Sequence, residues 1–294
     1  PSHPMFVKVE QIREDTHTSP RFHFLASFDP SRLWRIQLLV MSLSRPLTAF
    51  SALSFDCYGT LVDWESGIVN GLQPLIRRLS SSDALRYDKN ALLERYIYHE
   101  GVIQTKNPEW KYTVILEHVY EALAVELGLQ DFVTPEEKTA FGASIKEWPA
   151  FPDTVSALKE LNKHYKLIIL SNVDNDSFNR TLAGPLAEVK FDAVYVAEDI
   201  GTYKPNLHNF EYLVEHTQQV FQIPKDRLLH TAYALHHDLV PAHEIGLATC
   251  WIERKPNAIG GELSEVSGRL ELAYQFAELA DLAEAAKVAF DALD

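Results

Sequence analysis

The sequence predicts an α/β fold: a parallel sheet covered by helices, with a block of further helices inserted after the first strand. From residue 153 onward, short apolar runs alternate with segments of helical periodicity. This alternation is typical of parallel strands joined by crossover helices. Residues 66–146 instead place apolar side chains at steps of three and four, with few strand signals. An insertion after the first strand can lie over the strand tips as a lid.

The elements follow one another in a regular order. The first strand is an apolar run that begins at Phe50 and ends at Asp56. After the helical block, the Trp and Pro residues of 148–152 indicate a linker, and Asp153 is a candidate helix N-cap. Further strands are expected at 166–170, 191–197, 227–231 and 248–252, and helices at 153–164, 206–217, from about 238, and at 277–291.

The chain therefore divides into three parts. Residues 48–65 and 150–294 form the α/β core, and residues 66–149 form the helical insertion. Residues 1–40 have mixed charge and no sustained period, so we expect residues 1–47 to form an extension outside the main fold. A targeting segment is the alternative for this extension, but its Asp and Glu residues argue against a transit peptide, which is poor in acids.

Composition excludes several classes of function. The 294 residues are 46% hydrophobic and carry a formal net charge of −14, so binding of nucleic acid through a basic face is not expected. No apolar run approaches the ~20 residues of a membrane span. Cys57 and Cys250 are too few for a disulfide framework, which favours a reducing, cytoplasmic location.

Polar residues follow the ends of several strands, where parallel sheets bind their ligands. They are Asp56, Ser171, Asn172 and the group around Asp238. A carboxylate such as Asp56 is ionised at neutral pH and can attack without a general base. The sequence therefore predicts a site at this edge of the sheet, with Asp56 as a candidate nucleophile.

Four segments carry a resemblance to a known family: FDCYGT (55–60), LSNVD (170–174), YKP (203–205) and HHDLVPAHEIGL (236–247). Together they resemble the haloacid dehalogenase (HAD) superfamily, over nearly all of residues 48–291. The resemblance implies a HAD-like Rossmannoid core with an inserted helical cap. It also implies that Asp56 is the nucleophile and that Ser171, Lys204 and Asp238 assist it.

Two positions make the sequence look like one branch of that superfamily. Tyr58 and Tyr233 stand where the magnesium-dependent phosphatases carry acids. The L-2-haloacid dehalogenase (type II) branch is similar to this sequence at both places. The implied reaction is displacement of halide from a 2-haloacid by Asp56, through an ester, to give a 2-hydroxy acid. It requires no metal or other cofactor.

The same resemblance implies a small anionic substrate. Tyr58, Thr60, Asn172 and a cap arginine would bind it, and Arg95, five residues before Glu100, is the candidate arginine. The family is often dimeric, so a homodimer is a further expectation.

Alternatives stay open at this stage. One is a magnesium-dependent phosphatase acting on a small organophosphate, and another is a non-catalytic binding protein on the same fold. His230, His236, His237 and His243 could also suggest a transition-metal site, but only Asp238 offers a neighbouring carboxylate, so we expect packed or solvated histidines.

Overall fold

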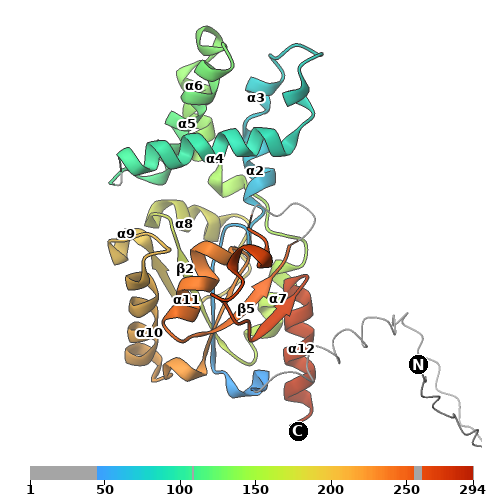
Figure 1. Ribbon diagram of the computed structural model, residues 1–294, viewed down its shortest axis with the longest axis vertical. Coiled ribbons are helices and arrows are strands. Elements are labelled where there is room, and N and C mark those ends of the chain that lie inside the picture. Colours follow the sequence, from blue (N-terminus) through green and yellow to red (C-terminus); the bar gives the residue numbers. More distant parts are fainter. Residues whose placement is uncertain (1–44, 108, 255–259, 294) are drawn as a thin grey trace, which may run out of the picture.

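A single six-stranded parallel sheet forms the centre of the core (Figure 1). The computed structural model describes residues 45–107, 109–254 and 260–293. The sheet order is β3-β2-β1-β4-β5-β6, so β1 lies between two strands that come much later in the chain. The strands are β1 (Ala52–Phe55), β2 (Lys166–Ser171), β3 (Ala193–Val196), β4 (Leu228–Ala232), β5 (Ala248–Ile252) and β6 (Tyr274–Phe276).

Helices cover both faces of the sheet because side chains alternate along each strand. Leu53 of β1 joins the apolar cluster beneath α7 (Thr154–Leu161), α8 (Asn175–Ala183) and α12 (Leu279–Asp291). Its neighbour Ala52 joins the opposite cluster, with α9 (Ala197–Ile200), α10 (Leu207–Phe221) and α11 (Val240–Glu244). The central strands are thus mainly apolar and almost entirely buried, as expected for a sheet covered on both faces.

The inserted helices form a separate layer above the core (Figure 1). They are α2 (Trp64–Gly71), α3 (Gln73–Ile76), α4 (Lys89–Lys106), α5 (Tyr112–Glu126) and α6 (Pro135–Gly142). Their two connections to the core lie side by side, because Val62 and Ala150 form an antiparallel bridge and the Asp63 N–H donates to Pro149 O at 2.8 Å. Within the described residues, no helix combines the length and the apolar character needed to cross a membrane.

The predicted α/β class and its parallel sheet are confirmed, and the differences are local. β6 was not predicted, because three residues give too short a pattern. The helix expected from about 238 begins as a π-helical turn at Leu235–Leu239 and continues as α11. Helix α8 was not predicted separately, although Asp174, interpreted from the sequence as a helix cap, caps it by accepting from the Ser177 N–H at 2.8 Å.

The fold that the structure describes starts before residue 48. Leu47 is buried in the core, and the Tyr274 hydroxyl donates to Arg45 O at 2.6 Å. The expectations for residues 1–44 lie outside the described residues.

Candidate active site

Asp56 lies directly after β1, at the carboxyl end of the central strand. Its N–H donates to Thr231 O of the adjacent strand β4 at 3.2 Å. The chain then turns sharply through Gly59, whose φ of +98° is a conformation that side chains rarely adopt. A Cβ at Gly59 would also lie 2.8 Å from Cδ1 of Tyr233. The turn that follows Asp56 therefore requires glycine.

Lys204 joins two buried carboxylates at this edge of the sheet. Its Nζ lies 2.8 Å from Oδ1 of Asp56 and 2.6 Å from Oδ1 of Asp238. The third donor of the ammonium group bonds Leu170 O at 2.9 Å. All three side chains are buried. The predicted residues Asp56, Lys204 and Asp238 thus meet in one cluster. All three N–H donors of the Lys204 ammonium group bond protein oxygens.

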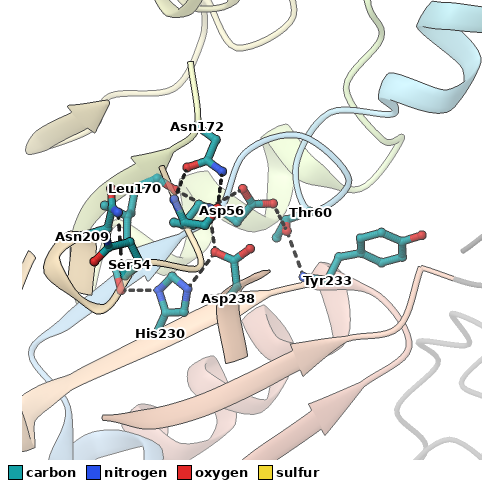
Figure 2. Close-up of polar contacts among 11 residues, drawn as sticks. Ser54, Asp56, Thr60, Leu170, Asn172, Asn209, His230, Tyr233 and Asp238 are labelled. Atoms are coloured by element: carbon teal, nitrogen blue, oxygen red, sulfur yellow. Dashed lines mark hydrogen bonds and ion pairs between the residues drawn. The ribbon is translucent and has the colours of Figure 1, made fainter. Parts of the chain in front are cut away.

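His230 is a member of this cluster that the sequence analysis did not select. Its Nε2 lies 3.2 Å from Oδ1 of Asp238, and its Nδ1 lies 2.9 Å from Oγ of Ser54 (Figure 2). These two contacts hold the imidazole in place, and the imidazole in turn fixes the orientation of the Asp238 carboxylate. A signal was present, because His230 interrupts an otherwise apolar strand, but its partner Ser54 could be found only from the β1–β4 register.

Burial and charge move the pKa values of the cluster in different directions. Burial raises the pKa of Asp56, and the charge of Asp238 adds to this, while Lys204 and the Thr60 hydroxyl oppose it. Burial would also raise the pKa of Asp238, but Lys204 and His230 outweigh it, so that pKa lies below its usual value. Burial alone would lower the pKa of Lys204, and the two carboxylates raise it above normal. Lys204 therefore stays protonated.

Thr60 and Asn172 hold the cluster in place. The Thr60 hydroxyl donates to Oδ2 of Asp56 at 2.9 Å and accepts from the Tyr233 N–H at 2.9 Å (Figure 2). The amide of Asn172 bonds both the N–H and the O of Lys204. These contacts give both residues a positioning role, and Thr60, expected to bind substrate, is fully buried behind Asp56.

Ser171 and Tyr58 face a cavity of about 660 Å³ above the cluster. The Ser171 hydroxyl is buried and has no hydrogen-bond partner among the described residues, so it is available to a bound molecule. The Tyr58 hydroxyl is engaged, at 2.7 Å from Oγ1 of Thr181. The cavity lies between core and cap, because its lining residues include Asp56, Ser171, Asn172, Lys204 and Asp238 from the core and Ile97, Glu100, Gln104 and Tyr112 from the cap.

The structure places Arg95 outside this cavity. Its side chain is 44% exposed and forms an ion pair with Glu126 of α5. Residues Ile97, Glu100 and Gln104 form the face of α4 that lines the cavity. At about 100° per residue, Arg95 projects about 140° away from Glu100, on another side of the helix. The expectation that Arg95 contacts the substrate is therefore corrected, because the residue that α4 presents to the cavity is Glu100.

Glu100 is a second residue that the sequence analysis did not select for the site. Its Oε1 accepts from the Tyr96 hydroxyl at 3.0 Å and from the Tyr112 hydroxyl at 2.5 Å. Burial raises the pKa of Glu100, while the two tyrosine hydroxyls oppose the shift. No signal in the sequence separates this glutamate from the other acids of α4.

Across the described residues, no group of three or more His, Cys, Asp or Glu side chains has the arrangement of a metal site. His236 and His237 line the cavity, and His236 Nε2 lies 3.2 Å from Oε2 of Glu265. The space between Asp56 and Asp238, where a metal ion would find two carboxylates, is taken by the ammonium group of Lys204.

Comparisons with known proteins agree with the fold. Residues 50–230 match the family model of the haloacid dehalogenase-like hydrolases. No curated protein matches the chain.

Several solved structures have the same fold. An L-2-haloacid dehalogenase is 22% identical, with a TM-score of 0.64 over 81% of this chain and 99% of its own. The L-2-haloacid dehalogenase of Xanthobacter autotrophicus, with chloropropionic acid covalently bound, is 16% identical, with a TM-score of 0.62 over 81% and 98%. A HAD-hydrolase from Bacillus subtilis, bound to magnesium, is 18% identical, with a TM-score of 0.59 over 81% and 99%.

Proposed function

Because this chain belongs to the haloacid dehalogenase-like hydrolases, we propose that it hydrolyses a carbon–halogen bond at C2 of a 2-haloacyl compound, with Asp56 as the nucleophile and without a metal ion. A 2-haloacid is the simplest such substrate, and a 2-hydroxy acid is then the product. The observation that carries the proposal is the Asp56–Lys204–Asp238 cluster on the floor of the cavity. The covalent chloropropionic acid in the Xanthobacter dehalogenase supports it.

In the first step, a carboxylate oxygen of Asp56 attacks C2 of the substrate. The C–halogen bond breaks, the halide leaves with the bonding electron pair, and an ester joins Asp56 to C2. Halide needs no proton to leave, which is consistent with Tyr58 two residues after the nucleophile. Lys204 and Thr60 hold the two oxygens of Asp56 in fixed positions, so the attacking group is oriented before the substrate arrives.

In the second step, water attacks the carbonyl carbon of the Asp56 ester. Asp238 accepts a proton from this water, and Lys204 stabilises the negative charge that develops on the former Asp56 carboxyl oxygen. The bond between the Asp56 carbonyl carbon and the ester oxygen then breaks, and the leaving alkoxide takes the proton from Asp238 to become the alcohol. The Asp56 carboxyl group loses its proton to solvent, which restores the carboxylate. His230 keeps Asp238 oriented for proton transfer through its 3.2 Å contact. Overall, one water is consumed, and one halide and one proton are released.

A magnesium-dependent phosphatase is the other candidate, favoured by the magnesium-bound Bacillus structure. The donor set does not fit the ion. Mg²⁺ prefers a shell of oxygen ligands at 2.0–2.1 Å, whereas Nζ of Lys204 lies between the two aspartates. Tyr58 and Tyr233 add no carboxylate.

A paired assay with an isotope label tests the proposal. Halide release from 2-chloropropionate and 2-chloroacetamide is measured with EDTA and again with Mg²⁺, beside phosphate release from an aryl phosphate. Halide release that EDTA leaves unchanged is expected. In a single turnover in H₂¹⁸O with enzyme in excess, the label should enter Asp56 and not the product. Label in the product would exclude the ester, and phosphate release that requires Mg²⁺ would support the phosphatase.

The pH profile of halide release gives a further prediction. Asp56 attacks only when ionised, and burial raises its pKa above the ordinary ~3.9. As pH falls through this raised value, kcat/KM should fall, so the acid limb should lie above pH ~4. Stopped assays across the acid range measure the limb, and circular dichroism at each pH checks that the protein is folded. An acid limb at or below the ordinary aspartate pKa of ~3.9 would contradict the assignment of Asp56 as the nucleophile.

A further inference from the structure

The cap side of the active-site cavity is built around Glu100. Two tyrosine hydroxyls, from Tyr96 on α4 and Tyr112 at the start of α5, converge on its Oε1. The two hydroxyls also lie 3.0 Å from each other. Among the described residues, no hydrogen bond reaches Oε2 of Glu100. This carboxyl group is therefore oriented by the cap and keeps one oxygen available to a ligand in the cavity.

Tyr112 connects this group to the core. Its backbone N–H donates to Oδ2 of Asp174 at 2.8 Å, and Asp174 is the N-cap of α8 in the core. The position of Glu100 over the floor of the cavity is thus fixed by contacts on both sides. Glu100 is not a surface residue that happens to face inward.

Aromatic rings surround the same space. Five described lining residues are Tyr or Trp, and they come from both layers: Tyr58, Trp64, Tyr112, Trp148 and Tyr233. The Trp148 ring packs edge to face against Tyr58 and Tyr112, with centroids 5.6 and 6.4 Å apart. The faces of such rings attract cations, and clusters of aromatic rings bind quaternary ammonium groups in proteins.

The charges of the lining also disfavour an anion. The described lining contains five acids, Asp56, Glu100, Asp238, Glu262 and Glu265. Lys204 is the only Lys or Arg in that described lining, and its three donors already bond Asp56, Asp238 and Leu170. A substrate carboxylate would therefore meet a carboxylate in the cap, and the one Lys or Arg of the described lining is already occupied, which leaves only the imidazoles of His236 and His237 as possible cationic partners.

We propose that Glu100 and the surrounding aromatic rings bind an ammonium group of the substrate, so that the preferred substrate is a 2-haloacyl compound with a positively charged substituent beyond the acyl group. This inference rests on the proposed function for the reacting end only. The reacting C2 lies at Asp56 on the floor, and the ammonium group lies under the cap. A cavity of about 660 Å³ has room for both ends.

Binding of choline tests the ammonium site without any turnover. Tryptophan fluorescence or calorimetry on the full chain measures choline against propionate, because both are small and differ in charge. Choline should bind and propionate should not compete with it. Glu100→Gln should weaken choline binding at least 10-fold. The matched control is Glu94→Gln, an exposed glutamate on the same helix α4 and outside the cavity lining, which should bind choline as the unmodified protein does.

Tyr112→Phe provides a second variant should Glu100→Gln fail to fold. It removes one of the two hydroxyls on Oε1 and keeps the ring, so choline binding should weaken by a smaller factor. Choline affinity that is the same in both variants as in the control would overturn the inference. Propionate that binds as tightly as choline would overturn it too.

Kinetics then separate this inference from the proposed function. Halide release is compared for 2-chloroacetate and for 2-chloro-N-[2-(trimethylammonio)ethyl]acetamide. The cationic amide should have the higher kcat/KM, and Glu100→Gln should raise its KM at least 10-fold with a smaller change in kcat. A preference for chloroacetate would overturn the inference and leave the function intact. Halide release from neither compound, with choline still bound through Glu100, would overturn the function alone.

Discussion

The Lys204→Met variant is expected to lose about 3–5 kcal/mol of folding free energy at neutral pH, together with its activity. Removal of one partner from a buried ion pair leaves an uncompensated charge, and a cost of that size follows. Here the loss would leave two buried carboxylates, Asp56 and Asp238, facing each other. Urea unfolding followed by circular dichroism measures the free energy of unfolding, and the halide assay measures the activity.

The control is Lys166→Met. Lys166 pairs with Asp192 at 2.7 Å, but its side chain is 50% exposed, so its loss should cost less than about 1 kcal/mol. The deficit of Lys204→Met should also shrink as the pH falls, because without the ammonium group the carboxylates have raised pKa values and become neutral together. If Lys204→Met loses no more folding free energy than Lys166→Met at any pH, the cluster is not the buried charge network described above.

Asp56→Asn should abolish halide release without unfolding the protein. Loss of a catalytic-triad residue in a serine protease costs on the order of 10⁴–10⁶-fold in kcat, and a loss of similar size is expected here. Stability should be unchanged or higher, because burial raises the pKa of Asp56, and an ionised group with a raised pKa destabilises the folded state at neutral pH. The amide oxygen of Asn can still accept from Lys204 or Thr60.

Asp176→Asn serves as the matched variant, since Asp176 is an exposed residue of α8 that pairs only with Arg180 among the described residues. It should keep full halide release and normal stability. Halide release by Asp56→Asn at a rate near that of Asp176→Asn would remove Asp56 from the mechanism. A biological function that survives Asp56→Asn would favour the other alternative, a non-catalytic binding protein on the same fold.

The sheet and the floor of the site could be predicted because they depend on local patterns. Apolar runs ending in Asp56 and Ser171 mark strand ends, and the carboxyl ends of parallel strands meet at one edge. These patterns predict that Asp56, Ser171, Asn172 and Asp238 lie together, whereas Lys204 was expected there only from the family resemblance of the YKP segment. The role of His230 was not predicted, because it depends on the register of β1 against β4, which brings Ser54 beside it.

The cap side of the cavity could not be predicted in the same way. Arg95 and Glu100 lie on one helix, and only the rotation of α4 decides which of them faces the cavity. That rotation is set by packing: Tyr96 is buried, and Arg95 pairs with Glu126 of α5. The amphipathic pattern of α4 is weak, with charged and apolar residues mixed along it. Resemblance to a family with a cap arginine therefore suggested the wrong side of the helix.

The position of β1 in the sheet has a consequence for how the chain folds during synthesis. Ala52 pairs with Lys166 on one side and with Leu228 on the other, so the central strand waits for partners made more than a hundred residues later. Contacts this distant in sequence slow folding, because a long loop must close before they form. The cap helices, which contact near neighbours, can form first on the ribosome. Asp56 is therefore translated long before its surroundings are complete, since Asp238 must emerge before Lys204 has both its partners.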